Sequence, residues 1–205
     1  MTDKHGTLNV TGTGNVSASP DEAIIQLGVF TDARTATEAT TSNASATKRV
    51  IDAVSAQPNH GVTTTGLSVN PIFSYDETTH ISTIVGFRAT NGVNVKTKVG
   101  YAGQIYDAGI TAGATQSSGI TFQIQNEAPL REEALRLAVE NAHREAKLVA
   151  QAARVDLTGI DSLQIDAGGG RLLYRAAALD LKATPVLPED KTISASVQIT
   201  YRTRA

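Results

Sequence analysis

The residues that could support chemistry in this sequence are few and widely separated. Its four histidines are His5, His60, His80 and His143. None of them pairs with a second ligand at the i,i+4 spacing of a helical metal site. The cluster Asp76, Glu77 and His80 has the right side chains for a cation, but a solvated loop explains it more simply. We therefore predict no metal-binding residues.

Catalytic patterns are also missing. The sequence has no cysteine, which excludes thiol catalysis, disulfides and cysteine-based zinc sites. It contains no G-x-S-x-G nucleophile motif, and its acidic residues fall on helix surfaces and in turns. The glycines Gly12 and Gly14 lack the third glycine and the following helix of a nucleotide-binding loop, so we interpret them as a turn or bulge. We predict no catalytic residues, no cofactor and no enzymatic activity.

Charge and length narrow the class of partner. The 205 residues carry 18 basic and 20 acidic side chains, a net charge of -2, which excludes a basic nucleic-acid binder. No apolar run approaches the roughly 20 residues of a membrane-spanning helix. The first residues also lack the apolar segment of a secretory leader. Either the protein is cytoplasmic, or the sequence is that of a mature exported form.

Period-two alternation dominates the chain and predicts strands with one apolar and one polar face. The clearest case is 86–99, where Phe87, Val93 and Val95 alternate with polar residues through Asn91-Gly92, so we expect a continuous strand there. Pro71 in the strand 63–75 removes a ladder donor and predicts either an edge position or a bulge. Strands are expected at 7–14, 22–31, 63–75, 86–99, 119–125, 157–165 and 192–202.

Alanine-rich helices are available to cover the apolar side. Residues 32–57 and 126–154 show apolar side chains at three- and four-residue spacing, and 101–112 is a shorter helix. In the first, the stripe includes Asn43 as well as Ala39 and Val50. Small side chains let a helix lie close to a sheet.

These elements predict an α+β fold. We expect a mostly antiparallel sheet with two long helices and one short helix packed on one face, in repeated strand-strand-helix units. No change in composition cuts the chain, so we expect a single domain over 1–205, with a hairpin around 65–98 that projects from it.

Four stretches carry a resemblance to a known family. They are Val10–Gly14 with Ser19–Ala23, Tyr75-Asp76 with Gly86–Asn91, Leu130–Leu135 with Ala138-Val139, and Ile193–Tyr201. In this order they resemble the SIMPL-domain proteins, a bacterial envelope family of unknown function. Gly92 departs from the β-favouring residue that the family usually has there.

The resemblance implies an exported protein, periplasmic or associated with the outer membrane, that forms a homo-oligomer and is linked to stress protection in some members. It brings no catalytic residues. Our first hypothesis is therefore a non-enzymatic, self-associating envelope protein, joined through the edge strand or the hairpin, with peripheral envelope association and no transmembrane helix. The alternative is a periplasmic binding module for a small ligand or protein client, on the polar sheet face or near Gly168–Gly170.

Overall fold

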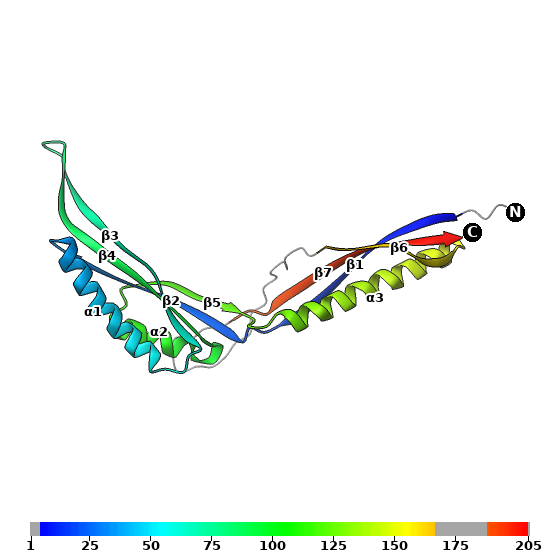
Figure 1. Cartoon of the computed structure of the whole chain (residues 1–205), viewed down its shortest axis with the longest axis horizontal. Coiled ribbons are helices and arrows are strands. Elements are labelled where there is room, and N and C mark those ends of the chain that lie inside the picture. Colours follow the sequence, from blue (N-terminus) through cyan, green and yellow to red (C-terminus); the bar gives the residue numbers. More distant parts are fainter. Residues whose placement is uncertain (1–4, 167–187, 205) are drawn as a thin grey trace. The chain divides into compact units, whose positions relative to one another are not determined.

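The computed structural model describes residues 5–166 and 188–204. Within these ranges it contains seven strands and three α-helices, and all strand pairs are antiparallel, which confirms the predicted α+β class (Figure 1). The elements are β1 (His5–Ala18), β2 (Glu22–Ala33), α1 (Ala36–Ser55), β3 (Gly61–Asp76), β4 (Ile81–Lys98), a 3-10 turn η1 (Val99–Tyr101), α2 (Ala102–Thr111), β5 (Gln116–Gln123), α3 (Ala128–Ala153), β6 (Asp156–Asp166) and β7 (Lys191–Arg204).

The strands form two sheets, where the sequence pattern suggests one layer. One sheet has the order β1-β7-β6 and the other β3-β4-β2-β5. The described chain accordingly groups into two compact units, one of residues 5–19, 124–166 and 189–204, the other built on residues 20–123. Alternation shows which face of a strand is apolar but not which strands pair, so this division was not visible in the sequence. The expectation of a single domain stays a prediction.

In the four-stranded unit, α1 and α2 cover one face of the sheet. The core joins Ile25, Leu27 and Val29 of β2 with Val93 and Val95 of β4. The two helices contribute Ala46, Val50, Val54, Ala102 and Ile105. Helix α1 begins with a capping box, in which Thr35 accepts from the Glu38 backbone N–H and Glu38 accepts from the Thr35 N–H. The prediction that 86–99 is one strand with a buried apolar face is confirmed, and Phe87 is half-buried.

The three-stranded unit is covered by α3 alone. Its buried side is a row of alanines at four-residue spacing, Ala134, Ala138, Ala142, Ala146 and Ala150. This row packs on Val10 of β1 and on Val197, Ile199 and Tyr201 of β7. Figure 1 shows α3 running along these strands.

Gly12 and Gly14 form neither a turn nor a bulge, so that prediction is wrong. Both lie inside β1, which pairs with β7 without a register shift, opposite Val197 and Ala195. A Cβ atom on Gly12 would lie 2.0 Å from the Ala138 carbonyl oxygen, and one on Gly14 would lie 2.0 Å from that of Ala134. The two glycines are therefore needed because the backbone of α3 lies directly on β1.

Gly92 has a similar explanation. Strand β3 shifts register between Thr65 and Ser68, and Gly66 there has a φ of +64°. A Cβ on Gly92 would lie 2.6 Å from the Thr65 carbonyl oxygen. Glycine at position 92 thus accommodates a bulge in the neighbouring edge strand, and β4 continues through it.

Candidate functional site

The structure does not gather the histidines that the sequence singles out. His80 Nδ1 lies 2.9 Å from the Tyr75 hydroxyl in the β3–β4 turn, and His143 Nδ1 lies 3.2 Å from the Tyr201 hydroxyl beside α3. His60 lies near Glu22 in the four-stranded unit. Within residues 5–166 and 188–204, no group of three or more His, Asp or Glu side chains is placed to hold a metal ion.

The Asp76 side chain stabilises the turn between β3 and β4. Its Oδ1 accepts hydrogen bonds from the backbone N–H groups of Thr78 and Thr79, at 2.8 and 3.2 Å. These donors hold the pKa of the Asp76 carboxyl below its usual value of 3.8, because they stabilise the charged form. The cluster of Asp76, Glu77 and His80 is thus arranged around the turn backbone. The cleft expected near Gly168–Gly170 lies outside the described residues.

A buried carboxylate that the sequence analysis did not single out is Glu22, at the start of β2. It is almost fully buried and accepts a hydrogen bond from the Gln123 amide of β5. Its other oxygen lies 3.6 Å from His60 Nδ1. A buried carboxylate needs such partners, so this group fastens the first residue of β2 to β5 and to the segment before β3. In the sequence, the only indication of this group is that a charged residue stands at the first position of an otherwise apolar strand.

Asn43 is a second buried polar group, and the helical spacing did predict its inward position. Its amide nitrogen donates to the carbonyl oxygens of Val29 and Ala89, at 2.9 and 3.0 Å. Its own oxygen accepts from Thr47 Oγ1 at 3.3 Å. One side chain of α1 therefore bridges β2 and β4. This role is structural, because all three polar contacts are internal to the unit.

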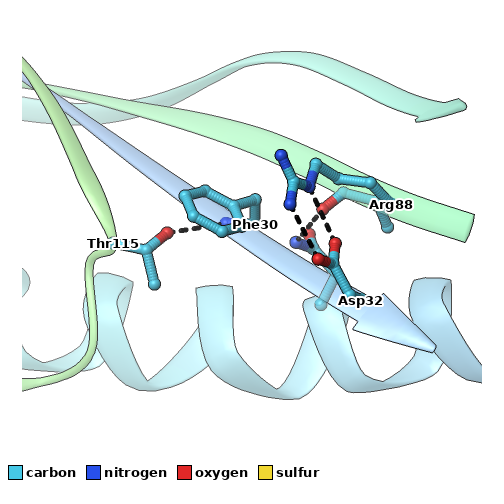
Figure 2. A network of polar contacts seen from close by, with 6 residues as sticks. Phe30, Asp32, Arg88 and Thr115 are labelled. Carbon is cyan, nitrogen blue, oxygen red and sulfur yellow. Dashed lines mark hydrogen bonds and ion pairs between the residues drawn. The ribbon is translucent and has the colours of Figure 1, made fainter. Parts of the chain in front are cut away.

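At the far end of β2, a polar network links the next-to-last residue pair of the β2–β4 ladder, Asp32 and Arg88 (Figure 2). The Arg88 guanidinium donates twice to Asp32, at 2.8 and 2.7 Å, and lies 4.7 Å from the centre of the Phe30 ring. The hydrogen bonds from Arg88 hold the pKa of the Asp32 carboxyl below its usual value. Thr115 Oγ1 accepts from the Phe30 backbone N–H at 2.9 Å. The pair is solvent-exposed, so it positions the strand end and leaves little free charge for a ligand.

Beyond this network, β3 and β4 continue as a two-stranded ribbon. Strand β2 ends at Ala33, opposite Phe87, whereas β3 and β4 stay paired out to Asp76 and Ile81. We call residues 72–86 the distal ribbon; Figure 1 shows it reaching past α1 to a loop. Five of its large apolar side chains are 55–60% exposed: Phe73, Tyr75, Ile81, Ile84 and Val85. The prediction that β3 is an edge strand is confirmed.

The outer face of the three-stranded sheet is polar and shallowly hollowed. A depression of about 640 Å³ is lined by Gly6, Thr7, Thr158, Asp161 and Arg202. A second, of about 400 Å³, is lined by Thr11, Gln164, Ile165, Ser196 and Gln198. Both are open, and no polar side chain that lines them is deeply buried.

Comparison with known proteins shows which family the chain belongs to. The sequence profile of the SIMPL family, described as a protein of unknown function, matches residues 8–201. The chain belongs to the SIMPL family. It is 28% identical over 215 residues to the 26 kDa periplasmic immunogenic protein of Brucella melitensis biotype 1, covering 98% of this chain and 86% of that protein. The protein of the same name from Brucella abortus strain S19 matches to the same extent.

The SIMPL assignment agrees with the stretches quoted from the sequence, which lie in β1 and the start of β2, at the end of β3, in β4, in α3 and in β7. Both relatives are periplasmic by name. Among the described residues, no helix is both long and apolar enough to cross a bilayer.

Proposed function

We propose that this SIMPL protein is a non-enzymatic component of the bacterial cell envelope that associates with further copies of itself through the distal ribbon. The observation that carries the proposal is the set of apolar side chains on residues 72–86, which lie more than half exposed on a ribbon of two strands. A two-stranded hairpin is only marginally stable in water. Exposed apolar patches of this kind mark interaction sites.

The apolar face of the ribbon is better suited to this contact than its edge. Phe73 and Ile84 are direct cross-strand partners, so their side chains share one face, and Tyr75 follows on that face two residues along β3. The ladder of β3 is interrupted by register shifts after Thr65 and after Ile72. Such irregularities hinder the addition of a further strand.

Burial of this face provides free energy for association. Full burial of a large apolar side chain contributes about 1.5–3 kcal/mol, so burying the exposed half of Phe73, Tyr75 and Ile84 contributes about 2–5 kcal/mol for each ribbon. This gain is reduced by the entropy lost on association. Micromolar affinity requires about 8 kcal/mol, so we expect assembly only at the upper end of a micromolar-to-millimolar dilution series.

The names of the two relatives support a proposal for the cellular location of this chain. Both are named as periplasmic, and we propose that this chain is likewise exported and acts in the periplasm or at the envelope surface. The link to stress protection rests on the family resemblance and stays a prediction. Fractionation of cells expressing the natural gene tests the location, because recovery in the cytoplasmic fraction would contradict it.

Light scattering on the purified chain tests self-association. We expect an oligomer for the natural chain and a monomer for a variant with Phe73→Ser and Ile84→Ser. Leu148→Ser is the matched control, because Leu148 is 68% exposed on α3 and lies outside the ribbon. The proposal fails if the natural chain is monomeric, or if the ribbon variant and the control have the same mass as the natural chain.

Binding of a small polar ligand is a second candidate, favoured by the 640 Å³ depression on the outer sheet face. Arg202 and Asp161 offer opposite charges there. A thermal-shift screen with small zwitterionic compounds tests this function. A ligand that stabilises the natural chain but not Arg202→Ala would support it, since binding to the folded state raises the melting temperature.

A further inference from the structure

A second apolar surface lies in the three-stranded unit, on β6. Three side chains form what we call the β6 stripe: Ile160, Leu163 and Ile165. They pair across the ladder with Tyr201, Ile199 and Val197 of β7, so they point to the same side of the sheet as these residues. The β7 partners are buried under α3, whereas the stripe is 45–57% exposed.

The stripe is exposed because one helix covers only part of the sheet. Helix α3 lies directly on Gly12 and Gly14 of β1, packs also on β7, and touches β6 only lightly. The four-stranded unit differs, because there α1 and α2 lie side by side over the sheet. The described part of the three-stranded unit has no second helix beside α3.

We propose that the β6 stripe is the surface on which the distal ribbon of a second copy of the chain docks, so that copies join head to tail. This inference rests on the proposed function and specifies its partner surface. Both surfaces are exposed apolar side chains on an antiparallel pair of strands: Phe73, Tyr75 and Ile84 on one face of the ribbon, and the stripe over the six residues from Ile160 to Ile165.

Charge favours this pairing over contact between two ribbons. Between Val62 and Phe87 the chain has two carboxylates, Asp76 and Glu77, and no lysine or arginine. The flank of α3 that faces β7 and β6 carries His143, which contacts Tyr201, and Lys147 one turn further along. A ribbon lying on the stripe would bring its carboxylates toward Lys147, whereas two ribbons together offer each other no lysine or arginine.

This contact allows further copies to be added. It joins two different surfaces of the same chain, so a joined pair of copies keeps one free ribbon and one free stripe. Such heterologous contacts close into rings or continue as filaments, depending on the rotation between copies.

Cysteine cross-linking tests the inference in a chain with no natural cysteine. One preparation carries Ile84→Cys on the ribbon and a second carries Leu163→Cys on the stripe. After mixing and mild oxidation we expect a disulfide-linked dimer, because docking brings the two positions to disulfide distance. A repeat with Phe73→Cys and Ile160→Cys guards against one pair having unfavourable geometry. Leu148→Cys, more exposed than either, is the negative control and is expected to give no dimer with Ile84→Cys.

The outcomes separate the possible contacts. A cross-link only in the mixture supports the inference. Dimers of Ile84→Cys alone would indicate ribbon-to-ribbon contact and overturn it while leaving the proposed function intact. Dimers of Leu163→Cys alone, or no cross-link with either pair while the natural chain remains oligomeric, would also overturn it. A monomeric natural chain would overturn both proposals.

Charge reversal gives an independent readout. Adding Lys147→Glu to the stripe preparation is expected to lower the yield of mixed dimer, and Glu77→Lys on the ribbon preparation is expected to restore it. An unchanged yield with Lys147→Glu would contradict the charge pairing.

Discussion

The close contact between α3 and β1 predicts that alanine is not tolerated at positions 12 and 14. The added Cβ of Gly12→Ala would lie 2.0 Å from the Ala138 carbonyl oxygen and 2.6 Å from the Ala142 nitrogen. Ordinary contacts begin near 3.4 Å, so the helix must move away by more than 1 Å. This movement would leave a gap between the alanine row and the sheet, and alanine side chains are too short to fill it.

Overpacking of this kind costs about 1–3 kcal/mol, and we expect Gly12→Ala and Gly14→Ala each to destabilise by about 2–3 kcal/mol because the obstructing atoms are backbone. Gly100→Ala is the matched control. Gly100 has no atom within 4 Å of the added Cβ and no positive φ, so its free energy of unfolding should stay within about 0.5 kcal/mol of the natural chain. Urea denaturation followed by circular dichroism measures all three. If Gly12→Ala and Gly14→Ala unfold at the same urea concentration as Gly100→Ala, the close packing of α3 on β1 is refuted.

Four further predictions concern polar groups. Asn43→Ala removes two buried hydrogen bonds between α1 and the sheet, and we expect it to lower the free energy of unfolding, measured by urea denaturation, by about 2–4 kcal/mol. The control Asn141→Ala loses one exposed hydrogen bond to Thr13 and should lower it by about 1 kcal/mol or less. Equal losses would refute the bridging role of Asn43. The folded pKa of Asp76 is depressed, so its contribution to stability is present above pH 3.8 and is lost as the pH falls through the folded pKa; NMR should show the Thr78 and Thr79 amides losing protection in that acid range but not at pH 6. Arg88→Gln should raise the pKa of Asp32 toward its usual value, measured by carboxyl carbon NMR, and an unchanged pKa would show that the pair does not persist in solution. Burial raises the pKa of the Tyr201 hydroxyl, so stability should fall as the pH rises above 10, and a Tyr201→Phe variant should lose less stability over that range.

The sequence predicted the elements well because their signals are local. The alternation around Val93 and Val95 predicted a strand that continues through Asn91-Gly92, and the structure shows one continuous strand. The spacing in α1 placed Asn43 with the apolar residues, and it is fully buried. Pro71 identified the edge strand correctly.

The misinterpretations concern contacts between residues far apart in sequence. Gly12 and Gly14 look like turn residues until α3, more than 100 residues later, is placed on them. The sequence also could not show that β2 ends at Ala33, before it can support the apolar residues of the distal ribbon.

The central claim is that the distal ribbon joins copies of the chain, and sedimentation equilibrium over a dilution series tests it most directly. We predict that the natural chain and Leu148→Ser assemble at the upper end of the concentration series, and that the Phe73→Ser, Ile84→Ser variant sediments as a folded 21.5 kDa monomer at every concentration. A natural chain that remains monomeric throughout, or a ribbon variant that assembles as the natural chain does, would contradict it.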